Sequence, residues 1–194
     1  MQKEKARIWN LPNALTMLRL LLIPVFIILM CQDHMMPALA VFVFASFTDI
    51  LDGWIARKYN LITDFGKLFD PLADKLMVMS VMTLLVIKGI VPLVAIIILI
   101  SKELLMLIGS YLLMRKNVIV YSFAIGKIAQ FITVAGLILC FFHKEFAALG
   151  IPVHLIVLWI GVGLAVVSMF YYGFTNGPKL FITHNNTTDE DLEG

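Results

Sequence analysis

The stretch from Thr48 to Lys75, TDILDGWIARKYNLITDFGKLFDPLADK, contains the most informative pattern in the chain. Asp49 and Asp52 come near the end of one long apolar segment, and Asp70 and Asp74 come near the start of the next. Residues three or four apart share one face of an α-helix, so each pair points one way. A short loop between the helices would bring the two pairs together. We therefore expect the four carboxylates to converge at one end of a helical hairpin.

Four carboxylates in one place need a counter-charge, because like charges resist ionisation. Oxygen ligands of this kind suit Mg²⁺ or Mn²⁺, and the stretch contains no His or Cys to favour zinc. Two such ions could neutralise a diphosphate and activate an attacking hydroxyl. The opposing interpretation is that these charges only mark the ends of membrane helices and are solvated by headgroups. Four aspartates at these spacings favour a functional site, since ionisable groups at membrane depth are costly.

Small residues and a cation lie among the aspartates. Gly53 follows Asp52, and Ala56 lies one turn beyond it, which leaves room for a ligand or for tight helix packing. Gly66 comes near the start of the following helix, where free N–H groups favour a phosphate. Arg57 supplies a positive charge for a phosphate oxygen.

The composition indicates a protein that lies in a lipid bilayer. Of 194 residues, 61% are hydrophobic and only 14% are charged, whereas a soluble domain is about 45–50% apolar and about 25% charged. The net charge of +2 gives no compositional support for nucleic-acid binding. Cys31 and Cys140 do not form a metal-binding or disulfide pattern.

Six apolar stretches are each close to the length of about 20 residues that a membrane-spanning helix needs. They are residues 11–31, 36–56, 67–87, 91–114, 121–142 and 152–175. The sequence therefore predicts an all-α integral membrane protein of six transmembrane helices. We expect residues 11–175 to form this domain, residues 1–10 an interfacial segment, and residues 176–194 a disordered polar tail.

Basic residues predict the orientation, because Lys and Arg are enriched on the cytosolic side of membrane proteins. One set of connections and the two ends of the chain contain most of them: Lys3, Lys5, Arg7, Arg57, Lys58, Lys67, Arg115, Lys116 and Lys179. The other side has only Lys88 and Lys144. We expect both termini and the aspartate cluster at the cytosolic face of the cell membrane.

The aspartate stretch resembles the signature of the CDP-alcohol phosphatidyltransferases at every position. The matching pattern is Asp49-x2-Asp52-Gly53-x2-Ala56-Arg57-x8-Gly66-x3-Asp70-x3-Asp74. The six-span plan extends this resemblance over about residues 10–174. The resemblance implies six transmembrane helices around a polar cavity that faces the cytosol. It also implies an enzyme that transfers a phosphatidyl group from CDP-diacylglycerol to an alcohol, with membrane lipids around it, and it suggests a homodimer.

The resemblance also implies roles for single residues. Asp49, Asp52 and Asp70 would bind two Mg²⁺ or Mn²⁺ ions, and Asp74 would complete the metal site and act as the base. The CDP group would lie against a set that shares residues with the metal site: Asp52, Gly53, Ala56, Arg57, Gly66 and Asp70.

The acceptor is predicted less directly. Asn10-Leu11-Pro12-Asn13-x2-Thr16-x2-Arg19 is similar to bacterial phosphatidylglycerophosphate synthases, as is the stretch at residues 60–67. This similarity favours glycerol 3-phosphate, a phosphorylated acceptor that needs cations. The candidate cations are Lys102, Arg115 and Lys127. Arg19 could reach the same cavity or extend to the interface.

The later spans depart from that subfamily. Lys102-Glu103 replaces an Arg-Glu pair, Ser110 replaces an arginine, and Ala129-Gln130 replaces Lys-Thr. A cardiolipin synthase, which uses phosphatidylglycerol as a lipid acceptor, is therefore the alternative within the family. A membrane cation transporter is the alternative from another class. It is disfavoured because the carboxylates gather at one face on two adjacent spans.

Overall fold

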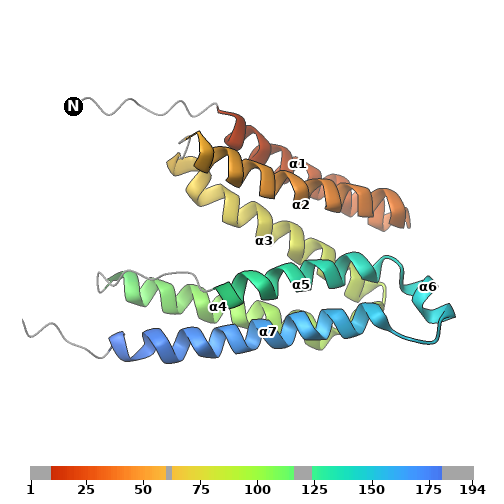
Figure 1. The fold of residues 1–194 in the computed structure, drawn as a ribbon. Coiled ribbons are helices and arrows are strands. Elements are labelled where there is room, and N and C mark those ends of the chain that lie inside the picture. Colours follow the sequence, from red (N-terminus) through yellow and green to blue (C-terminus); the bar gives the residue numbers. More distant parts are fainter. Residues whose placement is uncertain (1–9, 60–62, 116–123, 181–194) are drawn as a thin grey trace, which may run out of the picture.

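The computed structural model describes residues 10–59, 63–115 and 124–180, and these residues form an all-helical membrane protein (Figure 1). The helices are α1 (Leu11–Cys31), α2 (Met35–Lys58), α3 (Asp64–Ile87), α4 (Leu93–Arg115), α5 (Ala124–Cys140), α6 (His143–Ala148) and α7 (Val153–Asn176), followed by the 3-10 helix η1 (Gly177–Leu180). Each of the six apolar stretches corresponds to one long helix. The short helix α6 was not predicted.

Within the described ranges, four of the long helices, namely α1, α2, α4 and α7, are long and apolar enough to cross a membrane, so the chain is a multi-pass membrane protein. Helix α5 has only 17 residues, and α3 carries Asp70, Asp74 and Lys75. The count of six spans therefore stays a prediction. The predicted interfacial segment lies outside the described residues except for Asn10, and the predicted tail lies outside them after residue 180.

The long helices form two groups that meet along α3. Helices α1 and α2 pack against each other and against α3, while α5 packs along α7, with α4 beside α7. Figure 1 shows α3 running obliquely from the α1–α2 pair toward α4 and α5. Long apolar helices pack in this way in lipid because shape and small residues, not water exclusion, bring them together.

Small residues allow the close approach of α5 and α7. A Cβ atom on Gly161 would lie 2.7 Å from the backbone nitrogen of Thr133, and one on Gly136 would lie 2.8 Å from the Leu158 backbone. Gly163, by contrast, has no atom within 4 Å of the position of its Cβ. Glycines 136 and 161 are therefore part of the helix interface.

The apolar core lies at the end of the molecule away from the aspartates. Phe26 of α1 belongs to it, with its ring centroid 6.4 Å from those of both Phe42 and Phe141. Buried residues of α3, α4, α5 and α7, among them Leu85 and Leu137, extend this core. The opposite end of the bundle is the polar one.

An exposed ion pair joins two connections at the core end. Lys88, just after α3, contacts Asp33 in the turn between α1 and α2. The hydrogen bond from Lys88 and its positive charge lower the pKa of the Asp33 carboxyl below its ordinary value.

Candidate active site

The start of α1 presents a polar stripe to the α2–α3 hairpin. The Asn10 side chain caps the helix by accepting a hydrogen bond of 3.0 Å from the Asn13 N–H. Asn13, Thr16 and Arg19 then follow at intervals of three residues, and their exposed fractions are 5%, 0% and 1%. A spacing of three places them along one helix face. Buried polar groups need partners, and here the aspartate hairpin supplies them.

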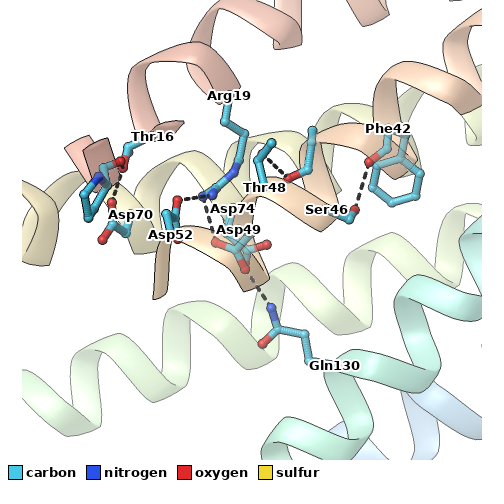
Figure 2. Close-up of polar contacts among 12 residues, drawn as sticks. Thr16, Arg19, Phe42, Ser46, Thr48, Asp49, Asp52, Asp70, Asp74 and Gln130 are labelled. Carbon is cyan, nitrogen blue, oxygen red and sulfur yellow. Dashed lines mark hydrogen bonds and ion pairs between the residues drawn. The ribbon is translucent and has the colours of Figure 1, made fainter. Parts of the chain in front are cut away.

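Arg19 holds the two aspartates of α2. Its Nη1 atom lies 2.7 Å from Asp49 Oδ1, and its Nη2 atom lies 2.5 Å from Asp52 Oδ2 (Figure 2). Asp52 is only 3% exposed, whereas Asp49 is 37% exposed. Arg19 therefore lies inside the site and does not extend to the membrane interface. Its Nε atom is buried and has no partner among the described residues.

The two aspartates of α3 are bound by different helices. The Thr16 hydroxyl of α1 donates a hydrogen bond to Asp70 Oδ1. The Gln130 amide of α5 donates to Asp74 Oδ2 over 2.7 Å (Figure 2). The structure thus brings the four predicted aspartates to one end of the bundle, each with a hydrogen-bond or ion-pair partner on α1 or α5.

The start of α3 is closed against α1 by side chains. Thr63 caps α3 by accepting a hydrogen bond of 3.0 Å from the Gly66 N–H, and its hydroxyl donates to Asn13 Oδ1 over 2.8 Å. A Cβ on Gly66 would lie 3.1 Å from Asn13 Oδ1 and 3.3 Å from Asp70 Oδ2. The sequence suggested that the Gly66 N–H would be free for a phosphate. In the structure this N–H donates to the Thr63 cap instead. Glycine at this position leaves room for the side chains of Asn13 and Asp70.

The remaining predicted CDP-binding residues are on α2. Gly53 and Ala56 are half-buried near the end of this helix, on the same stretch as Asp52. The Arg57 side chain lies outside the described part of the structure, so its role stays a prediction.

The donor chemistry of the site fits a divalent cation. Arg19 pairs with two of the four carboxylates, and the other two accept from the neutral Thr16 and Gln130, so the cluster is negative if all four are ionised. Carboxylate oxygens are the ligands that Mg²⁺ and Mn²⁺ prefer. Within the described ranges, however, no three acidic, imidazole or thiol groups already converge as a ligand set. An ion would have to share Asp49 and Asp52 with Arg19 or displace it.

A cavity of about 290 Å³ opens beside Asp74, between α3, α4 and α5. Its polar end contains Asp74, Gln130 and a charged triad in which Glu103 accepts from Lys102 over 2.6 Å and from Lys75 over 2.7 Å. The rest of its wall is apolar. A larger apolar groove of about 400 Å³ lies between α4 and α7 and contains none of the predicted site residues.

The three candidate acceptor-binding cations occupy different places. Lys102 borders the cavity but is paired with Glu103. Lys127 is exposed in the first turn of α5, three residues before Gln130. Arg115 ends α4, where its guanidinium lies 6.0 Å from the centre of the Tyr111 ring. Of these three described cations, only Lys102 borders the same cavity as Asp74.

Sequence reasoning missed the roles of Thr16, Thr63 and Gln130. The regular spacing of Asn13, Thr16 and Arg19 in an apolar helix was a usable signal for a polar stripe. Gln130 stood out only as a departure from related sequences.

Comparison with known proteins decides the family. The family model for CDP-alcohol phosphatidyltransferases matches residues 9–167. The chain belongs to this family. It is therefore a membrane-embedded phosphatidyltransferase, and the resemblance of the aspartate stretch is confirmed. Enzymes of this family generally depend on divalent metal ions.

Three relatives are similar to this chain over much of their length. The CDP-diacylglycerol--glycerol-3-phosphate 3-phosphatidyltransferase of Bacillus subtilis (strain 168) is 36% identical over 190 residues, covering 89% of this chain and 97% of that protein. The protein of the same name from Rickettsia typhi is 36% identical over 168 residues, covering 84% and 94%. A probable phosphatidylglycerophosphate synthase of Mycobacterium tuberculosis (strain H37Rv) is 34% identical over 134 residues, covering 66% and 64%.

Proposed function

We propose that this enzyme transfers the phosphatidyl group of CDP-diacylglycerol to glycerol 3-phosphate and so forms phosphatidylglycerophosphate and CMP. The names of the similar proteins support this donor and this acceptor. The observation that carries the proposal is the gathering of four carboxylates of α2 and α3 against Arg19, Thr16 and Gln130, beside a cavity bordered by lysines.

In the proposed reaction, an acceptor hydroxyl oxygen forms a bond to the phosphorus that carries the diacylglycerol. The bond from that phosphorus to the CMP oxygen breaks, and CMP leaves. Asp74 takes the hydroxyl proton, and its Oδ1 atom has no partner among the described residues. Lys102 and Lys127 would attract the acceptor phosphate. Gly53, Ala56, Arg57 and Gly66 would surround the cytidine diphosphate.

Asp49, Asp52 and Asp70 would hold two Mg²⁺ or Mn²⁺ ions, with Asp74 completing the set. When bound, the ions would supply positive charge for the diphosphate oxygens. Arg19 already neutralises part of Asp49 and Asp52, and it would keep these carboxylates oriented before an ion arrives. Thr16 would do the same for Asp70 through its hydroxyl.

The apolar wall of the cavity favours a second candidate, a cardiolipin synthase with phosphatidylglycerol as acceptor. Glycerol 3-phosphate has no apolar part that would need this wall. The acyl chains of either CDP-diacylglycerol or a lipid acceptor could pack against this apolar wall. The two candidates therefore differ in the acceptor and not in the metal site.

The test is CMP release from CDP-diacylglycerol by the purified protein in detergent, with Mg²⁺ or Mn²⁺ present. Glycerol 3-phosphate and phosphatidylglycerol are supplied in separate reactions, and Asp74→Asn is the control. Turnover with glycerol 3-phosphate supports the proposal. Turnover with phosphatidylglycerol alone would replace it with the second candidate, and turnover with neither would refute both.

We further propose that the aspartate end faces the cytosol in the cell membrane, with both termini on that side. Cys31 ends α1 at the opposite end of the bundle and is exposed, whereas Cys140 is buried. A maleimide that cannot cross membranes should label Cys31 in intact cells, and Cys31→Ser should remove the label. Labelling only after the cells are broken open would reverse the orientation. The homodimer stays a prediction.

A further inference from the structure

Two consecutive residues of α3 connect the two helix groups through polar contacts. Asp74 accepts a hydrogen bond of 2.7 Å from Gln130 on α5, and Lys75 forms an ion pair of 2.7 Å with Glu103 on α4. Among the described residues, these are the polar side-chain contacts that join α3 to the second group near the aspartates. Asp74 is thus the one aspartate of the four that a residue of that group holds (Figure 2).

The Gln130 amide is suited to hold a carboxylate without taking part in proton transfer. Its Nε2 atom donates to Asp74 Oδ2, and a side-chain amide neither takes up nor releases a proton near neutral pH. The other oxygen, Oδ1, stays available. A bond on one oxygen of a carboxylate fixes the rotation of the group and therefore the direction in which the second oxygen points.

Gln130 is not needed to hold α5 in place. It is exposed at the edge of the cavity, whereas Thr133, Leu137 and Cys140 farther along α5 are buried. Leu137 and Cys140 belong to the apolar core that also includes α3. Removing the amide would therefore disturb the Asp74 contact and leave the packing of α5 intact.

We propose that Gln130 is a positioning residue for the transfer reaction, which holds Asp74 so that Oδ1 receives the proton of the acceptor hydroxyl. The inference rests on the proposed role of Asp74 as the base. Gln130 acts through Asp74 and does not contact the reacting phosphorus. Loss of the contact lowers the rate of the chemical step, because misplacement of a reacting group by about 1 Å can cost about 100-fold.

The experiment compares three variants of the full-length protein in the CMP-release assay. Gln130→Met keeps the length of the side chain and removes the donor. Gln130→Lys keeps an N–H donor at this position. Phe131→Ala is the matched control, because Phe131 is the next residue of α5 and its side chain is 71% exposed.

The expected result for Gln130→Met is a kcat lowered by roughly 10- to 100-fold, with the KM for CDP-diacylglycerol within about twofold of wild type. Gln130→Lys should retain a clearly higher kcat than Gln130→Met, and Phe131→Ala should retain wild-type kcat. The thermal unfolding midpoints of all variants should agree with wild type. A purely structural role would instead lower the midpoint, and the Lys variant would not recover activity.

Wild-type kcat in Gln130→Met would overturn the inference, as would equal losses in the Met and Lys variants. These outcomes differ from a failure of the proposed function. If the wild-type enzyme releases no CMP with any acceptor, the proposed function fails. If Asp74→Asn is fully active, the assignment of Asp74 as the base fails, and a positioning role for Gln130 fails with it.

Discussion

Arg19 provides the sharpest stability test, because it is a buried charge between two carboxylates. Its side chain is 1% exposed, and its partner Asp52 is 3% exposed. Replacing it with Met keeps much of the volume and leaves Asp52 as a buried charge without its partner. Breaking a buried pair in this way costs about 3–5 kcal/mol.

The lower end of that range applies here, because Asp49 is 37% exposed and water can solvate it when Arg19 is removed. A loss of about 3 kcal/mol corresponds to a fall of roughly 6–12 °C in Tm for a chain of this size. Arg19→Met combined with Asp52→Asn removes both charges and should recover much of the loss. Added Mg²⁺ should also stabilise Arg19→Met more than wild type, because the ion would no longer compete with the guanidinium.

A thiol-reactive dye can follow unfolding through Cys140, which is fully buried. Cys31 is exposed and would react at once, so the measurements use a Cys31→Ser background in detergent. EDTA is present in every run except those that test added Mg²⁺. Lys88→Met is the control, since it removes the exposed pair with Asp33 and should leave Tm nearly unchanged. If Arg19→Met unfolds within about 2 °C of wild type, or if Lys88→Met is equally harmful, the buried-pair reasoning is wrong.

Three other predictions concern the metal site, the helix interface and the acceptor. Replacement by Asn of Asp49, Asp52 or Asp70, which are predicted to bind metal, should abolish CMP release. Near-normal turnover in all three variants would contradict the metal assignment. Gly161→Ala should lower the free energy of unfolding, measured in the dye assay, by about 1–3 kcal/mol, because its Cβ would meet the backbone of Thr133. Gly163→Ala should lower it little, and equal effects of the two variants would show that the contact is not tight. Lys127→Ala should raise the KM for glycerol 3-phosphate by about tenfold. Lys144→Ala, at the other end of the bundle, should leave this KM unchanged. An unchanged KM in Lys127→Ala would assign phosphate binding to another cation.

The helices could be predicted well from sequence, because apolar length is a direct consequence of bilayer thickness. The first predicted span, residues 11–31, matches α1 residue for residue. The partners of each helix could not be predicted in this way. In lipid a helix is apolar on nearly every face, so its sequence does not indicate which side packs against protein. Helix α6 was missed because it has only six residues and lies in a connection.

The site was predictable where local spacing determines it. The three-residue interval correctly placed Asp49 with Asp52, because Arg19 contacts both, whereas Asp70 and Asp74 contact different helices. The contacts of Gln130 with Asp74, and of Arg19 with Asp49, join residues from helices far apart in the sequence. Such pairings depend on tertiary packing, which the intervals along one helix do not specify.

The position of α3 explains why its two aspartates can have different tasks. Asp70 and Asp74 lie one turn apart on one face, yet Thr16 of α1 holds the first and Gln130 of α5 holds the second. The first therefore belongs to the α1–α3 group together with Arg19, while the second lies where this group meets α4 and α5. A base at this junction is correctly placed only when the two groups are in contact. The cavity beside Asp74 has walls from both groups, so an acceptor bound there would contact both groups at the same place.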